Sequence, residues 1–441
     1  MTTILLVGAL LFADEKIPLS PFLKRTFYVT TITSSVIASA LYPPTSLVIL
    51  NYANAFLSVA YALRAIELLL VDNSRRLDRL VKVNHASPAE YVWKPLPPAL
   101  TLGRLLAVFD LLINPRGIGW AHGSKRYLPG LKRTNVAAQN GFRQKAEKHR
   151  EDERFTVKEA TQSRLSFLVK EALKLSIAYL VYDAYGVVFG HNYATLCSNF
   201  HSFLNGPHLL QFELQYFGHQ LRPLPETSAR LVRRFLLPPA CWAACYAFID
   251  GIHAAFALID VGMLYLVAPT RASDPWMYPA VFGSWRYMLW PRLKDIWGKL
   301  WHDLCRRTLI SSSSALIPRW TPVALGRFCV GVLSFIISGV VHAAGTYAVS
   351  KDLHAVLMMM VFFILLPFFV ALQEAVSVQV LEKFLPDWYI TKILIWAVDV
   401  TYVVWWGYHT APMFFSYSMI PESLASAPLP GSWSLWERFQ T

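Results

Sequence analysis

Charged residues are scarce in this chain. Asp, Glu, Lys and Arg make up 16% of its 441 residues, whereas 55% are hydrophobic and 14% are aromatic. A soluble domain usually carries about 25% charged residues. Several apolar runs approach the length of about 20 residues that a helix needs to cross a bilayer. The composition therefore excludes an ordinary soluble domain and favours a polytopic membrane protein.

Cysteine is also rare, and the five cysteines show no spacing typical of metal ligands. Two of them, Cys241 and Cys245, lie four residues apart in an apolar run. That spacing puts both on one face of a helix, where packing is the better interpretation. We therefore expect no metal site and no resident cofactor.

Three patterns of familiar enzymes are missing. The chain has no G-x-S-x-G turn that would present a nucleophilic serine, and no H-x-x-x-D pattern of soluble acyltransferases. It also has no pair of closely spaced aspartates that could hold Mg²⁺ and a diphosphate. The last absence argues against an intramembrane prenyltransferase or terpene cyclase.

The net charge of +13 does not indicate nucleic-acid binding. No nucleic-acid recognition module is visible, and the basic residues lie mainly between apolar segments. In such places they orient a membrane protein and contact anionic lipid headgroups. Membrane lipids are therefore expected partners and nucleic acid is not.

We predict an all-α, polytopic helical bundle with about eight transmembrane helices. The expected spans are 3–13, 27–41, 46–71, 165–189, 240–267, 323–349, 356–378 and 390–417. Pro43 and Pro44 should break the second span from the third, and Pro238 and Pro239 should open the span at 240–267. Whether 3–13 crosses the membrane is open. The segment 99–113 is short and carries Arg104 and Asp110, so it either lies in the interface or re-enters.

No flexible linker separates two cores, so we expect one domain over residues 1–441. A basic loop at 121–164 and a second loop at 270–320 should project from it. Between residues 125 and 164, eleven Lys or Arg face five acids. Basic loops face the cytosol, so 75–94, 125–164 and 286–307 are expected there.

One histidine, His342, lies within an apolar span among small residues, in the run Ser338-Gly-Val-Val-His-Ala-Ala-Gly345. An ionisable residue inside a membrane is a functional-site hypothesis by default. A neutral imidazole can take a proton from a hydroxyl, so His342 is a candidate general base. A core histidine bonded to a carbonyl is the alternative. Asp250 and His253 share another helical face and are expected to pair structurally.

The loop before this span mixes aromatic, basic and imidazole groups. It reads Asp295-Ile-Trp-Gly-Lys-Leu-Trp-His302 and continues to Arg306 and Arg307. Trp297 and Trp301 could belong to an interfacial aromatic belt, and the cations could be ordinary positive-inside charges. Lys299, Arg306 and Arg307 could equally contact the phosphates of a nucleotide carrier. We expect His302 to meet His342 at one site.

The segment from Asp295 to His302 resembles the D-F-W-G-R-R-W-H motif of wax-synthase-like membrane-bound O-acyltransferases, although Ile296 and Leu300 depart from it. Asn114 to Trp120 resembles the R-G-I-G-W segment of the fungal branch, and 338–345 resembles the span with that superfamily's histidine. The three matches occur in order across most of the chain.

The resemblance implies a helical enzyme of the endoplasmic reticulum with a tunnel for acyl-CoA. By that analogy His342 is the base and His302 orients the acyl carbonyl. Trp297, Trp301, Lys299, Arg306, Arg307 and Arg116 are the expected acyl-CoA contacts. It implies acetyl transfer from acetyl-CoA to a hydroxyl of a hydrophobic terpenoid or meroterpenoid. A long-chain wax or sterol ester synthase and a non-catalytic transporter are the alternatives.

Overall fold

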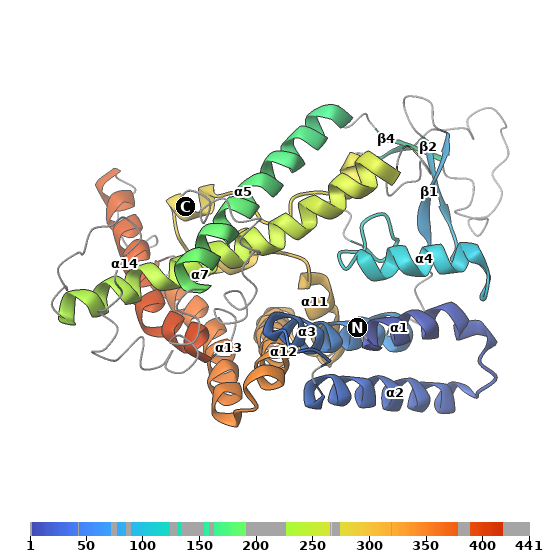
Figure 1. Cartoon of the computed structure of the whole chain (residues 1–441), viewed down its shortest axis with the longest axis horizontal. Helices are drawn as coiled ribbons and strands as arrows, with labels where there is room; N and C mark the ends of the chain where they lie inside the picture. The colour runs from blue at the N-terminus through green and yellow to red at the C-terminus, as the bar shows by residue number, and fades with distance from the viewer. Residues whose placement is uncertain are drawn as a thin grey trace.

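The structure, a computed structural model, is built almost entirely from helices (Figure 1). It describes residues 2–42, 44–71, 77–84, 90–123, 131–133, 154–157, 163–190, 226–264, 266, 274–318, 320–377 and 389–417. The predicted all-α class is thereby confirmed. Most of the predicted basic loop at 121–164, together with 191–225 and the tail from 418, lies outside the described residues.

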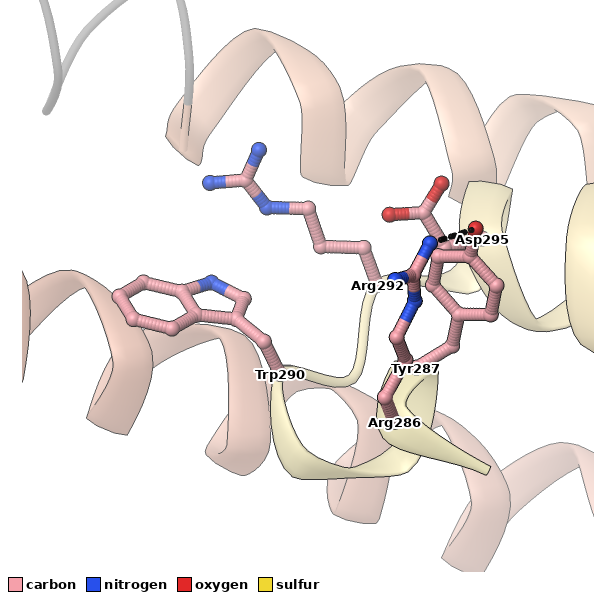
Figure 2. A pocket seen from close by; sticks show the side chains of 5 residues that line it. All are labelled: Arg286, Tyr287, Trp290, Arg292 and Asp295. Atoms are coloured by element: carbon pink, nitrogen blue, oxygen red, sulfur yellow. Dashed lines mark hydrogen bonds between the residues drawn. The ribbon is translucent and has the colours of Figure 1, made fainter. Parts of the chain in front are cut away.

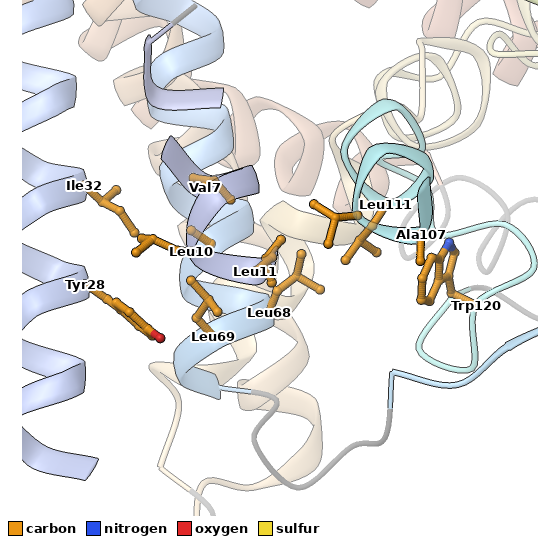
Figure 3. Packing of buried hydrophobic residues seen from close by; sticks show 12 residues of the cluster. Val7, Leu10, Leu11, Tyr28, Ile32, Leu68, Leu69, Ala107, Leu111 and Trp120 are labelled. Atoms are coloured by element: carbon orange, nitrogen blue, oxygen red, sulfur yellow. The ribbon is translucent and has the colours of Figure 1, made fainter. Parts of the chain in front are cut away.

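The N-terminal helices surround one apolar core (Figure 3). They are α1 (Thr2–Ala13), η1 (Asp14–Lys16), α2 (Pro21–Leu41), α3 (Val48–Ala65), its π-helical continuation η2 (Ile66–Val71) and α4 (Leu102–Ile113). Leu10 and Leu11 of α1 lie against Leu68 and Leu69 of η2, and Leu111 of α4 closes the cluster. This core fixes α3, which carries part of the candidate site.

Neither α1 nor α4 is long enough to cross a membrane. Each has 12 residues, or about 18 Å of helix, against a hydrocarbon core of about 30 Å. Arg104 of α4 is buried and donates to the carbonyls of Leu11 and Pro97. Arg104, which interrupts the apolar run at 99–113, therefore holds α4 against α1.

A small antiparallel sheet, which was not predicted, lies beside α4 (Figure 1). Its strands are β1 (Arg79–Asn84), β2 (Glu90–Lys94), β3 (Leu131–Arg133) and β4 (Arg154–Val157), in the order β1-β2-β4-β3. Lys82 and Tyr91 reach across to Asp274, at 2.9 Å and 2.6 Å. The sheet therefore anchors the start of the loop at 270–320.

Two long helices, α5 (Arg164–Gly190) and α7 (Glu226–Leu258), pack against each other, and α7 continues as π-helical η8 (Ile259–Leu264) (Figure 1). The candidate membrane span in this helix begins at Pro238, as predicted, and runs to Leu264. The helix itself begins earlier, at Glu226, so both prolines lie inside α7. Prolines are tolerated inside membrane helices because neighbouring groups satisfy the freed carbonyls.

The loop at 270–320 consists of short helical pieces: η10 (Pro275–Met277), α9 (Arg286–Leu289), α10 (Leu293–Asp295), π-helical η11 (Ile296–Leu300) and α11 (Arg306–Ala315). Three long helices follow: α12 (Val323–Ser350), α13 (Leu353–Glu374) and α14 (Tyr389–Tyr417). α12 packs against both α3 and α13. The helix carrying His342 therefore lies between the N-terminal and C-terminal parts.

Four helices in the described residues are long and apolar enough to cross a membrane. They are Pro238–Leu264, Val323–Ser350, Leu353–Ser377 and Ile390–Phe415. Helices also occur where we predicted the spans at 27–41, 46–71 and 165–189. A helical membrane protein is thus supported, while the count of eight stays a prediction.

Candidate active site

His342 lies on α12 and is enclosed by aromatic side chains from three other helices. Phe363 of α13 stacks on its ring, with centroids 5.0 Å apart and planes at 17°. Phe56 of α3 and Phe414 of α14 approach edge-on at 5.0 Å and 5.8 Å. The hydroxyl of Tyr52, also on α3, lies 3.1 Å from His342 Nδ1. Among the described residues, Nε2 has no hydrogen-bond partner.

Two glycines on α12 make room for these aromatic neighbours. A Cβ at Gly339 would lie 2.9 Å from Cβ of Phe363, and one at Gly345 would lie 2.8 Å from two ring atoms of Tyr52. Contacts that short force something to move. The small residues three positions before and after His342 therefore admit the two rings that hold the imidazole.

The two tryptophans of the predicted motif lie in or directly after the π-helix η11 and pack against other aromatic side chains. Trp297 is partly buried and packs against a buried cluster that includes Leu293, Phe362, Trp406 and Ala343, the residue after His342. Trp301 stacks on Trp242 of α7, with centroids 4.9 Å apart and planes at 12°.

His302 follows this π-helix. Its ring is 5.2 Å from Trp301 and 6.1 Å from Phe282, centroid to centroid. Burial lowers the pKa of His302 to about 4, so the imidazole is neutral at physiological pH. That His302 and His342 share one site stays a prediction.

Two buried atoms near these histidines lack hydrogen-bond partners among the described residues: His302 Nδ1 and Trp297 Nε1. Buried polar groups in proteins are nearly always paired, so each unpaired one calls for an explanation. A bound ligand that supplies a polar group is one such explanation. The indole N–H can only donate, whereas one nitrogen of a neutral imidazole donates and the other accepts.

The segment from Asn114 to Trp120 forms a tight turn that directs Arg116 at the loop of residues 270–320, called the motif loop below. Gly117 and Gly119 have φ of +64° and +74°, a region that favours glycine. The Arg116 guanidinium donates to the carbonyls of Pro279 at 2.8 Å and Ala280 at 3.1 Å. It lies 3.4 Å from the carboxylate of Asp303, the residue after His302.

Arg116 was expected to contact acyl-CoA, but protein groups engage its guanidinium. Besides the two carbonyls and Asp303, it donates to His253 Nε2 at 3.2 Å. Its side chain is only 6% exposed. The structure therefore gives Arg116 a clamping role that sequence reasoning did not anticipate. His253 faces Arg116, and the described contacts include no hydrogen bond between His253 and Asp250.

Arg307, another expected acyl-CoA contact, joins a buried ionic cluster. It lies 2.6 Å from Glu67 of η2, whose other oxygen pairs with Arg64 at 2.7 Å. Thr308 also donates to Glu67, at 3.3 Å. Buried carboxylates need such partners. Arg307 thus fastens α11 to the end of α3.

Lys299 and Arg306 lie at the surface of the motif loop. Lys299 is 52% exposed and pairs with Asp295 at 2.6 Å, one turn earlier. Arg306 is exposed and donates to the carbonyl of Gly298. Of the four predicted basic contacts, these two remain accessible to an anionic ligand.

A pocket of about 380 Å³ opens in the same loop (Figure 2). It is lined by Arg286, Tyr287, Trp290, Arg292 and Asp295. The fully buried Asp399 of α14 accepts hydrogen bonds from two of these lining residues, Trp290 at 3.0 Å and Arg292 at 2.9 Å. Sequence reasoning missed this pocket, although the alternation of basic and aromatic residues from 285 to 292 was a visible signal.

The comparisons agree with this geometry. Residues 278–365 match the membrane bound O-acyl transferase family, and this segment includes both histidines. Acetyltransferase eriL of Hericium erinaceus is 31% identical over 130 residues, which cover 29% of this chain and 32% of that protein. O-Mevalon transferase macI of Penicillium terrestre is 27% identical over 158 residues, 34% of this chain and 36% of that protein.

The matched segments span about a third of the length of these curated relatives. No solved structure matches this chain. The resemblance to the membrane-bound O-acyltransferases that the motifs indicated is nevertheless confirmed, over the segment that joins His302 to His342.

Proposed function

We propose that this chain is an O-acyltransferase that moves an acyl group from acyl-CoA to the hydroxyl of a hydrophobic small molecule. The observation that carries the proposal is the enclosure of His342 by aromatic rings, with its Nε2 left without a hydrogen-bond partner among the described residues. We place His302 at the same site. An unengaged imidazole nitrogen is what a general base requires.

In this reaction His342 acts on the acceptor. Its Nε2 takes the hydroxyl proton while the hydroxyl oxygen attacks the carbonyl carbon of the thioester. The C–S bond then breaks, the ester leaves, and the CoA sulfur receives the proton from His342. No covalent enzyme intermediate is needed, because a thioester is already activated. General-base assistance of this kind contributes about 10² to 10⁴ in rate.

The thioester carbonyl would lie against His302 and Trp297. Both have a buried polar atom without a partner among the described residues, and a donor aimed at the developing oxyanion stabilises the transition state. Trp301, stacked on Trp242, fixes the backbone from which His302 projects. These residues orient the acyl group and do not need to titrate.

Lys299 and Arg306 are the basic residues best placed for the phosphates of the donor. They are exposed, whereas the structure engages Arg116 and Arg307 with buried partners. The pocket formed by Arg286, Tyr287, Trp290, Arg292 and Asp295 adds the exposed guanidinium of Arg286 on the same loop, whereas Arg292 is engaged by buried Asp399. Arginine and lysine are the usual phosphate partners in proteins.

One relative is named an acetyltransferase, which favours a short acyl group, so acetyl-CoA is our preferred donor. For the acceptor we propose a terpenoid or meroterpenoid alcohol, on the resemblance of the motifs. The alternative long-chain ester synthase would need room for an acyl chain of many carbons. We further propose one domain over 1–441, in the endoplasmic reticulum, with the motif loop at 270–320 on the cytosolic side.

The test is acetyl-CoA-dependent acylation in microsomes that express the chain, with a panel of hydroxylated terpenoid acceptors. His342→Ala should lose most turnover, by about 10² to 10⁴, and His302→Ala should also lower it. His354→Ala is the matched control, because His354 is exposed at the start of α13. Near-native turnover in well-expressed His342→Ala would rule out the mechanism. Acceptor uptake without acylation would favour the transporter.

A further inference from the structure

We infer that Tyr52 is the residue that positions His342 for catalysis, by accepting a hydrogen bond from Nδ1–H and so leaving the lone pair of Nε2 exposed to the acceptor hydroxyl. This inference rests on the proposed function and goes beyond it. Tyr52 lies on α3, 290 residues from His342 in sequence. No catalytic motif of the chain includes it.

The hydrogen bond between Tyr52 and His342 has two possible directions. If the phenol donates to Nδ1, the imidazole proton is on Nε2, and Nε2 cannot accept a proton. If Nδ1–H donates to the phenol oxygen, Nε2 carries a lone pair. Which nitrogen is protonated in a histidine is set by the bond that the other nitrogen makes. Only the second direction supports a base at Nε2.

The chemistry of the phenol permits the second direction. Its oxygen has lone pairs that can accept a hydrogen bond from Nδ1–H while the hydroxyl keeps its own proton. The arrangement also stabilises the transition state, because the imidazolium formed by proton transfer donates a charge-assisted hydrogen bond to the phenol oxygen.

Gly345 holds the phenol in place. A Cβ there would lie 2.8 Å from the Cε2 and Cζ atoms of the Tyr52 ring, and Cζ bears the hydroxyl. Gly345→Ala must therefore displace the ring and, with it, the oxygen that meets Nδ1. This variant perturbs the hydrogen bond while keeping the hydroxyl, and it complements Tyr52→Phe.

The first test does not depend on turnover. Diethyl pyrocarbonate reacts with the lone pair of a neutral imidazole, and mass spectrometry of treated microsomes quantifies each modified histidine against exposed His354. We expect modification of His342, slowed in Tyr52→Phe because the Nε2–H form then gains population. The result that overturns the inference is an unmodified His342, or equal or faster modification in Tyr52→Phe, as expected if the phenol donates to Nδ1.

The second test is a double-mutant cycle on kcat. Tyr52→Phe should lower kcat about 10- to 100-fold, the range for a hydrogen bond to a charged group, with little change in KM. Gly345→Ala should lower kcat in the wild type and have almost no further effect in Tyr52→Phe. Additive losses would indicate independent packing defects and would refute the positioning role.

Tyr61→Phe is the matched control, since Tyr61 lies on the same helix and donates only to the carbonyl of Leu112 among the described contacts. It should keep its kcat. The outcomes also separate the two proposals. Full activity in His342→Ala defeats the proposed function. An inactive His342→Ala beside a fully active Tyr52→Phe defeats the positioning role alone.

Discussion

Replacing Arg116 tests whether the R-G-I-G-W turn binds the acyl donor or clamps the motif loop. The guanidinium is buried, and removing it with Arg116→Met leaves the carboxylate of Asp303, which is only 11% exposed, without this cation. It also leaves the carbonyls of Pro279 and Ala280 without these donors. Breaking a buried pair by removing one partner typically costs about 3–5 kcal/mol.

That loss should be visible in thermal unfolding. A domain of 150–250 residues loses about 2–4 °C of Tm per kcal/mol, and a larger one loses less. We therefore expect Arg116→Met to lower Tm by about 3–5 °C in detergent and to lower kcat, because Asp303 adjoins His302. Adding Asp303→Asn should recover part of the Tm, since the unpaired charge is gone.

The assay is a thermal shift of the purified protein, combined with steady-state kinetics in acyl-CoA concentration. Arg286→Met is the control, because that guanidinium is exposed at the same loop and its loss should leave Tm unchanged. A wild-type Tm with a raised KM for acyl-CoA in Arg116→Met would refute the clamp and restore Arg116 as a donor contact.

Three further predictions concern His302, the two neighbouring arginines and the turn. The pKa of His302 is about 4 in the folded protein and 6.5 for the free group. Between pH 4 and pH 6.5, His302 is therefore protonated in the unfolded chain and neutral in the folded one. Stability should fall by about 3 kcal/mol as pH drops from 6.5 to 4, and His302→Gln should flatten this slope in Tm. Arg306→Ala should raise the KM for acyl-CoA at unchanged Tm. Arg307→Ala should instead lower Tm, because it leaves the fully buried Glu67 without this partner. The reverse pattern would contradict the roles assigned to the two arginines. Gly117→Ala should destabilise the protein by about 1–2 kcal/mol and lower Tm, because Gly117 has φ of +64°. An unchanged Tm would argue against a strained backbone at this turn.

The residues predictable from sequence were those whose chemistry is unusual for their position. A histidine in an apolar span and a histidine at the end of an aromatic motif both stand out in the sequence alone. That the two imidazoles serve one site is an expectation from their cost in such surroundings, and it stays a prediction. The helical class followed in the same way from long apolar runs.

The partners of these residues were not predictable, because long-range contacts leave no local pattern. Arg116 is 187 residues from Asp303, and Tyr52 is 290 from His342. A basic residue beside a glycine-rich turn, such as Arg116, is equally compatible with a phosphate contact and with a buried ion pair. The small sheet was not predicted for a related reason. Its strands have only three to six residues, and apolar and charged residues are mixed within them.

The electrostatics of the core assign the two histidines different tasks. We place both in one site lined by aromatic rings, where two positive charges at once are strongly unfavourable. When His342 takes the proton of the acceptor, His302 must therefore be neutral. Burial lowers the pKa of His302 to about 4, in line with a neutral imidazole at physiological pH. His302 can then act only through a neutral hydrogen bond to the acyl carbonyl, and the proton that leaves with the CoA sulfur has to come from His342.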